Sequence, residues 1–265
     1  MLNLSNKLSL NNTRASGTSA PDLDFVITVD TTIAGSSGVG VMNLASAVGT
    51  AWDCDVDWGD GTSDTGVTSA PSHTYSSAGV YTIRMSGVEV FMNFGNLNDK
   101  LKITNVANWG IENINYHGAF YGCSNMTCTA TDAPTITTND IRNMFRSATL
   151  FNGDVSNWSV PIGTYRMDRC FQSATAFNQS IGHWDVSAVT FWTSIFYGTA
   201  LATDTPTSTV NLDAIYIGWA AQSVQASQTV DFGDAKYSPG AAATAMAVLE
   251  GAPNLWTLND GGEVT

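Results

Sequence analysis

Hydrophobic and polar residues alternate along the first third of the chain. The stretch "AWDCDVDWGDGTSD" places Trp52, Cys54, Val56 and Trp58 on one side and aspartates on the other. A period of two is typical of a β-strand with one buried face. The Gly-Asp-Gly that follows supplies residues able to take a positive φ, which predicts a tight turn. The same alternation predicts strands in "DFVITVD" and around Tyr81, Ile83 and Met85.

From about residue 101 a longer period appears. "FRSATLFNGDVSNWSV" at 145–160 is nearly repeated as "FQSATAFNQSIGHWDV" at 171–186. The step from Phe145 to Phe171 is 26 residues, and the step from Phe171 to Phe196 is 25. Such a period indicates stacked units that each cover the hydrophobic face of the next. Within a unit, the F-x-S-A-T-x-F-N half predicts a helix or tight turn and the W-[SD]-V half a short strand.

Helical patterns follow the repeats. "NLDAIYIGWAAQSVQ" predicts a helix with Asn211 as N-cap, and "SPGAAATAMAVLEGAPN" a second helix with Ser238 as N-cap. "LWTLNDGG" predicts a short terminal strand. These elements predict a helical C-terminal cap over 209–265. At the other end, residues 1–22 are polar and predict an arm that a partner orders.

The strand pair around the Gly-Asp-Gly turn resembles the polycystic-kidney-disease (PKD) type of immunoglobulin-like domain. That family has a tryptophan and Gly-Asp-Gly turn followed by an H-x-Y and G-x-Y strand pair. The matching residues are Trp58, Gly59, Asp60, Gly61, His73, Tyr75, Gly79 and Tyr81. The resemblance implies a small β-sandwich over 23–91, with the His73 ring hydrogen-bonded near the turn.

The repeats resemble the BspA-like leucine-rich repeats. "FNQSIGHWDVSAVT" (177–190) and "MFRSATLFNGDVSNWSV" (144–160) carry the resemblance, and "GAFYGCSNMTCTATDAP" (118–134) looks like that family's opening repeat. The resemblance implies a solenoid over 92–208 whose core includes Trp109, Trp158 and Trp184. The expected fold class is therefore mainly β with some α: a PKD/immunoglobulin-like sandwich, a short BspA-type solenoid and a helical cap. The C-terminal segment resembles tails behind such repeats in bacteriophage and marine bacterial proteins.

The charged residues of the chain limit the classes of function that we expect. Only 12% of residues are charged, and the formal net charge is −13 with no run of Lys or Arg. Such a surface repels phosphate backbones, so we expect no nucleic-acid partner.

No stretch approaches the roughly 20 apolar residues of a membrane span, and residues 1–22 lack the apolar core of a signal peptide. The cysteines lack zinc-site spacing and are predicted to be small buried hydrophobes: Cys54, Cys123, Cys128 and Cys170.

The row Asp53, Asp55 and Asp57, with Asp64 beyond, is the best candidate for a metal site. An EF-hand loop requires glycine where Trp58 stands, so we expect an acidic solvated face, with Ca²⁺ binding as the alternative. The sequence has no H-E-x-x-H, G-x-S-x-G or Walker motif. We therefore expect no enzyme and no cofactor.

Positions between the repeated aromatics vary from unit to unit, among them Tyr165, Arg166 and Trp192. Variable residues on a repeated frame are where a binding face is expected. Alternatively, the repeated tryptophans could stack on carbohydrate, but their fixed place in each unit favours a core role.

These patterns favour a non-enzymatic structural and binding protein of a phage particle, as capsid decoration or as a tail fibre or adhesin. It would fold in the host cytoplasm and reside in the virion, as an oligomer or part of an assembly. The arm 1–22 would bind other virion proteins, and the repeats a host protein or glycan. A bacterial cell-surface, extracellular adhesin is the alternative. A glycan-active enzyme is third, because repeats and cap leave no room for a catalytic domain.

Overall fold

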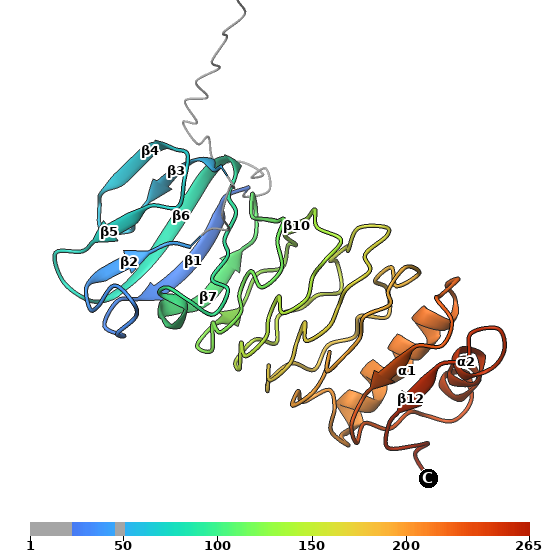
Figure 1. The fold of residues 1–265 in the computed structure, drawn as a ribbon. Coiled ribbons are helices and arrows are strands. Elements are labelled where there is room, and N and C mark those ends of the chain that lie inside the picture. The colour runs from blue at the N-terminus through green and yellow to red at the C-terminus, as the bar shows by residue number, and fades with distance from the viewer. Residues whose placement is uncertain (1–22, 46–50) are drawn as a thin grey trace, which may run out of the picture.

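The computed structural model describes residues 23–45 and 51–265. The arm predicted over 1–22 lies outside the described residues. The protein is elongated, with β-sheets at one end, coils of the repeats in the middle and two helices at the other end (Figure 1). The predicted fold class, mainly β with some α, is confirmed.

The N-terminal part is built on a six-stranded sheet in the order β4-β3-β6-β1-β7-β9. Neighbouring strands are antiparallel except β7 and β9, which are parallel. A separate antiparallel pair, β2–β5, adds Met42 to the same core, and Tyr75 joins it directly after β5. The strands are β1 (Phe25–Asp30), β2 (Val41–Asn43), β3 (Asp53–Asp57), β4 (Ser63–Val67), β5 (Ser72–Thr74), β6 (Val80–Glu89), β7 (Ile103–Asn108) and β9 (Thr127–Cys128).

The predicted turn after β3 is held by aromatic and polar contacts. The His73 ring stacks on Trp58 with centroids 4.7 Å apart, and its Nε2 lies 2.8 Å from the Asp60 carboxylate. The Tyr75 hydroxyl donates to the Trp58 carbonyl at 3.2 Å. The predicted hydrogen bond of His73 near the turn is therefore confirmed, and the four motif residues act as one structural cluster.

Strand β7 joins the sheet to the repeats. It pairs antiparallel with β1 on one side and parallel with β9 on the other. Directly after β7, Trp109 stacks on Phe25 at 6.1 Å and meets Phe120 edge-on at 5.4 Å. Sheet and repeats therefore share one hydrophobic core, and the strand pairing continues past residues 91 and 92. A short 3₁₀ helix, Lys100–Lys102, precedes β7.

Each repeat turns at two residues with positive φ, four positions apart, on either side of a buried phenylalanine. The pairs are Gly118 and Gly122, Asn143 and Ser147, Arg169 and Ser173, and Ser194 and Gly198. Left-handed residues end regular structure, so the phenylalanine half is a turn. The predicted W-[SD]-V strand is wrong, because the Trp158 and Trp184 N–H groups close turns onto Val155 and Ile181. Elsewhere, repeats pair through β8 (Asn113–Ile114) with β10 (Thr135–Ile136) and through single parallel bridges.

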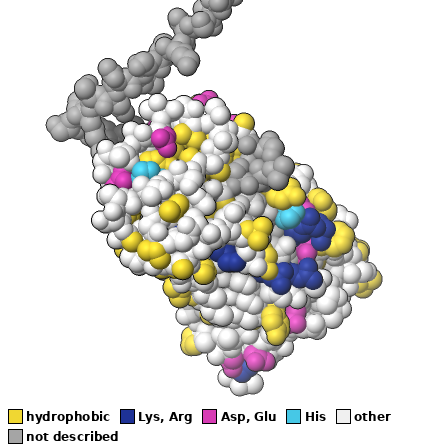
Figure 2. Space-filling view, turned by 60° about the vertical axis from the view of Figure 1, so that its left-hand side comes forward, with side chains coloured by type: hydrophobic (Ala, Val, Ile, Leu, Met, Phe, Trp, Pro, Cys, Tyr) yellow, Lys and Arg dark blue, Asp and Glu magenta, His cyan; other side chains and the backbone are white. Residues whose placement is uncertain are grey.

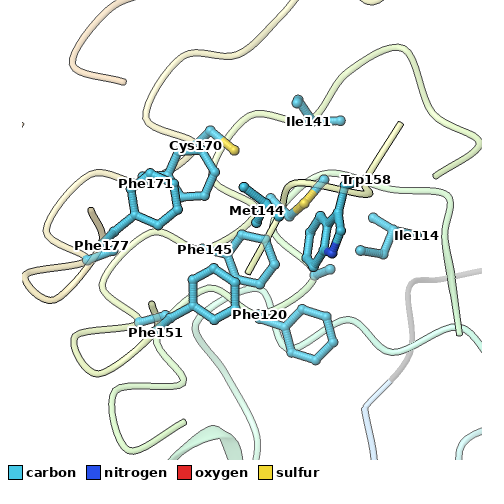
Figure 3. Packing of buried hydrophobic residues seen from close by; sticks show 14 of the residues in the cluster. Ile114, Phe120, Ile141, Met144, Phe145, Phe151, Trp158, Cys170, Phe171 and Phe177 are labelled. Carbon is cyan, nitrogen blue, oxygen red and sulfur yellow. The ribbon is translucent and has the colours of Figure 1, made fainter. Parts of the chain in front are cut away.

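One row of phenylalanines runs through the molecule, and we call it the phenylalanine ladder. Its members are Phe94, Phe120, Phe145, Phe171, Phe196 and Phe232. The three central steps are parallel stacks with centroids 5.7, 5.9 and 6.3 Å apart. The N–H of each of the first four donates to the carbonyl of the residue before the next. Figure 3 shows Phe120, Phe145 and Phe171 in this row, with Phe151 and Phe177 beside it.

The predicted core tryptophans are buried. Trp158 and Trp184 lie 5.7 and 6.0 Å from their own ladder phenylalanines, in equivalent surroundings. Trp109 instead meets Trp158 edge-on at 5.2 Å. In the repeat of Phe120, the position thirteen residues after the ladder phenylalanine is Ala133, where the next two repeats carry Trp158 and Trp184. The larger side chain of Trp109 occupies the space that a tryptophan at position 133 would fill. The stacked core role of the three tryptophans is confirmed.

The C-terminal cap contains α1 (Pro206–Ala220), α2 (Ala241–Glu250) and the parallel pair β11 (Thr229–Asp231) and β12 (Thr257–Asn259). Both predicted N-caps are wrong. Thr205 caps α1 through a capping box with Ser208 and precedes Pro206, whose fixed φ suits a first turn, whereas Asn211 donates to the Asn178 carbonyl. Helix α2 begins after Gly240 rather than at Ser238.

Helix α1 lies directly on the backbone of the last repeats. A Cβ atom on Gly182 would overlap the Ala214 carbonyl, and one on Gly218 would overlap the Gly182 carbonyl. The two glycines therefore set the closest approach of helix and repeat. Around them, Trp219 packs on Trp192 at 4.9 Å and on Trp256 at 6.1 Å.

We predict that Gly218→Ala destabilises the protein by about 1–3 kcal/mol, because the added methyl group forces the cap off the repeat. Helix propensity alone favours alanine over glycine by about 1 kcal/mol. The sign of the change in unfolding free energy therefore shows whether packing or propensity dominates. The measurement is the free energy of unfolding in urea. Thr207→Ala, at an exposed position of the same helix, is the control, with an expected change within about 0.5 kcal/mol. A stabilising Gly218→Ala would contradict the packing.

The turn cluster predicts a dependence of stability on pH. The Thr62 hydroxyl and the His73 ring lower the pKa of Asp60 to about 2, against ~3.9 in an unfolded chain. The stabilising effect of the carboxylate is therefore full above about pH 4 and is lost as the pH falls through about 2. We expect the difference in unfolding midpoint between wild type and Asp60→Asn to shrink over this range. A difference that stays constant would show that the cluster does not favour the charged carboxylate.

Candidate functional site

Side chains at equivalent places in successive repeats lie in columns across the solenoid. Five positions before a ladder phenylalanine stand Asp140, Arg166 and Phe191, and single parallel bridges join the three residues. One position after a ladder phenylalanine stand Tyr121 and Arg146. Residues about 25 apart in the sequence are therefore direct neighbours on the surface.

Arg166 is the centre of one contact group. Its guanidinium donates from Nε and Nη2 to the two carboxylate oxygens of Asp168, at 2.9 and 3.2 Å. The same guanidinium lies over the Phe191 ring, 4.7 Å from the centroid, and the Tyr165 ring meets Phe191 edge-on at 6.4 Å. Tyr165 is 43% exposed and Phe191 47% exposed. Two aromatic rings and an oriented cation thus face solvent together.

A second group lies one repeat towards the N-terminus. The Arg146 guanidinium lies over the Tyr121 ring at 5.0 Å from its centroid. The Nε of Arg142 is 3.3 Å from the Asp140 carboxylate. Arginine stacks on aromatic faces through a planar, delocalised cation, and stacking leaves its N–H edge available.

Arg169 completes the set, with Nη1 3.6 Å from Asp168. We call the following set the arginine–aromatic surface: Tyr121, Arg142, Arg146, Tyr165, Arg166, Arg169 and Phe191. Figure 2 shows Lys and Arg side chains gathered on one face over the repeats, among hydrophobic side chains.

The electrostatics of this surface differ from those of the rest of the chain. Four of the chain's ten Lys and Arg residues lie here, although the net charge of the chain is −13. The hydrogen bonds that Arg166 donates to Asp168 raise the pKa of Arg166. Nearby, partial burial and the Arg142 charge lower the pKa of His117. The sequence shows no run of basic residues because folding, rather than adjacency, brings these arginines together.

The predicted binding residues separate into two groups. Tyr165 and Arg166 lie together on the surface. Trp192 does not, because it is 3% exposed and packs between Trp219 and Trp256 at 4.9 and 5.6 Å. Its neighbour Phe191 points outward instead. Sequence reasoning missed Phe191, although its distance from the ladder phenylalanine equals that of Arg166.

The predicted metal candidates lie on the exposed face of β3. Asp55 accepts a hydrogen bond from the Gly66 N–H, and Asp57 accepts one from the Gly59 N–H. Asp64 accepts from the Trp58 indole nitrogen at 2.9 Å. Within residues 23–45 and 51–265, no three His, Cys, Asp or Glu side chains form a group that could hold a metal ion. Asp57 thus holds the turn after β3, whereas Asp55 contacts the neighbouring strand β4, and the carboxylates of β3 face solvent.

Two buried ionisable sites lie near the junction of sheet and repeats. The fully buried Lys102 donates to Ser37 and to the Gly38 carbonyl, and Asp99 accepts from the Asn43 N–H, so the pair holds the loop before β2. Glu112 is also fully buried, and burial raises its pKa well above the usual range. One of its oxygens accepts from the Met92 N–H.

All four cysteines are free thiols, and all but Cys128 are buried. Burial raises the pKa of Cys54 and of Cys128 to about 11. A thiol with such a pKa carries little nucleophilic thiolate at neutral pH. The prediction of small buried hydrophobes is confirmed for the three buried cysteines, and Cys128 is half-buried.

Across the described parts of the chain, no helix is both long and apolar enough to cross a membrane.

The sequence of the repeats also matches a known family. Residues 114–228 match the family model described as "Mycoplasma protein of unknown function, DUF285". DUF285 is a family of BspA-like surface repeats, which confirms that part of the resemblance. The match covers less than half of the chain and includes the whole arginine–aromatic surface. No curated protein and no solved structure matches the chain significantly.

Proposed function

We propose that this protein is a non-enzymatic binding protein that presents the arginine–aromatic surface to a partner on a cell surface. The observation that carries the proposal is the exposure of Tyr165 and Phe191 beside an oriented Arg166, on a frame whose ladder phenylalanine recurs in every repeat. Variable, exposed side chains on a rigid scaffold are typical of binding sites. The ionisable pairs Asp60–His73 and Asp99–Lys102 support a structural role for the remaining charged groups, since they hold a turn and a loop.

We further propose that the protein acts as part of a phage particle, as capsid decoration or as a tail fibre or adhesin. The polar residues 1–22 would bind other virion proteins, and the assembly would present several copies of the surface. Support comes from the sequence: residues 23–91 resemble a PKD-type domain, and the C-terminal segment resembles tails found in bacteriophage proteins.

A bacterial cell-surface adhesin is the second candidate, and the match of residues 114–228 to a family of surface repeats favours it. Both candidates use the same binding surface, so location separates them. Detection of the protein in purified phage particles supports the first candidate. Detection in bacterial envelope fractions, with none in particles, supports the second.

The binding surface itself is tested by a double variant, Tyr165→Asn with Phe191→Asn. Other repeats carry Asn139 and Asn115 at these places, so the variant is compatible with the fold. We expect the apparent dissociation constant for host bacterial cells to rise at least about tenfold, because aromatic anchors dominate such interfaces. Labelled protein and flow cytometry provide the measurement.

Val88→Thr, at an exposed hydrophobic residue of β6, is the matched control and should bind as wild type. Unfolding midpoints establish that each variant is folded. Undiminished cell binding by a folded double variant would refute the proposed role of this surface.

A further inference from the structure

The chemistry of the arginine–aromatic surface indicates what kind of partner it binds. We infer that the ligand is an acidic polysaccharide whose sugar units carry carboxylate groups, lying across the columns of the repeats. This inference rests on the proposed function and specifies its ligand class.

The first argument is charge. The surface contains four arginines and is bordered by two aspartates, Asp140 and Asp168, so its local charge is opposite in sign to that of the chain. Asp168 is already engaged by the bidentate contact of Arg166. Arg146 makes no ion pair within the described residues, and Arg169 makes only the 3.6 Å contact. Apart from a 3.4 Å hydrogen bond from Arg146 Nη1 to Asn143 Oδ1, their N–H donors are available. Arginine binds carboxylates with good geometry.

The second argument is the arrangement of the rings. The guanidinium groups of Arg146 and Arg166 lie over the rings of Tyr121 and Phe191, which holds them in place before a ligand arrives. Preorganised donors lose less conformational entropy on binding. The exposed faces of Tyr165 and Phe191 offer apolar contact to the C–H face of a sugar ring, as amphipathic aromatic side chains do at interfaces.

The third argument separates a polysaccharide from more densely charged polymers. Duplex DNA carries one negative charge per roughly 1.7 Å, and it would meet the carboxylate of Asp140 as well as the acidic remainder of the protein. In a polysaccharide with one carboxylate per sugar unit, successive charges lie a whole sugar ring apart and alternate with neutral hydroxyl groups. Its hydroxyl groups can donate to Asp140 and accept from arginine, so a surface of mixed charge suits it.

The test measures binding of the full chain to polygalacturonate by isothermal titration calorimetry. Neutral dextran, duplex DNA and phosphatidylglycerol vesicles are the comparison ligands. The key variant is Arg146→Gln with Arg169→Asn. Neighbouring repeats carry Gln172 and Asn143 at these places, and asparagine already adopts the positive φ there. Arg84→Gln with Lys236→Gln, outside the surface, removes the same charge and is the control.

We expect polygalacturonate to bind, more weakly at high salt, and the key variant to weaken binding about tenfold or more. The control should stay within about twofold. The inference is overturned by any of three results: no binding of polygalacturonate, equal binding of dextran, or tighter binding of DNA or vesicles. Wild-type affinity of the folded key variant would also overturn it.

The two experiments distinguish failure of the proposed ligand class from failure of the proposed binding surface. Cell binding that depends on Tyr165 and Phe191, without binding of polygalacturonate, rejects the acidic polysaccharide and leaves the binding surface in place. Cell binding that is indifferent to both variants rejects the surface itself.

Discussion

The parallel stacking of phenylalanine rings across repeats is the interaction on which the structure depends. A unit of about 25 residues with hardly any regular secondary structure cannot bury its own hydrophobic face, so each repeat relies on its neighbours. The ladder from Phe94 to Phe232 provides this cover, and a main-chain hydrogen bond accompanies each of its first four steps. An open stack has two uncovered ends. Here the six-stranded sheet closes one through Trp109, and α1 closes the other through the contact of Gly182 with Gly218.

The same regularity creates the arginine–aromatic surface. Because the ladder fixes the spacing between repeats, any side chain at a given offset from a ladder phenylalanine meets its counterparts in the next repeats. Two cation–π contacts, Arg146 with Tyr121 and Arg166 with Phe191, are contacts of this kind. The core therefore positions charged and aromatic groups on the outside, where their exposed faces can meet a ligand. Glu112 and the Asp99–Lys102 pair lie at the junction instead, where they belong to the architecture.

Sequence patterns predicted the features that recur along the chain. Repeated landmarks such as Trp158 and Trp184 indicated the stacked core, and alternation around Trp58 indicated the sheet and its turn. The patterns did not predict which way the side chain of an individual residue points. Trp192 faces the cap rather than solvent because a cap helix covers that end of the stack, which a repeat pattern does not encode. The arginines lie up to 27 positions apart in the sequence, so only the coiling of the chain reveals them as a cluster.

The central claim is that the phenylalanine ladder unites sheet, repeats and cap in one core. Hydrogen exchange of a Phe171→Ala variant tests it most directly. Loss of a buried ring costs about 3–5 kcal/mol, and we predict that amides of the flanking repeats and of α1 lose protection together, while Phe171→Leu loses much less. A loss of protection confined to residues 169–173, with α1 unchanged, would contradict the claim.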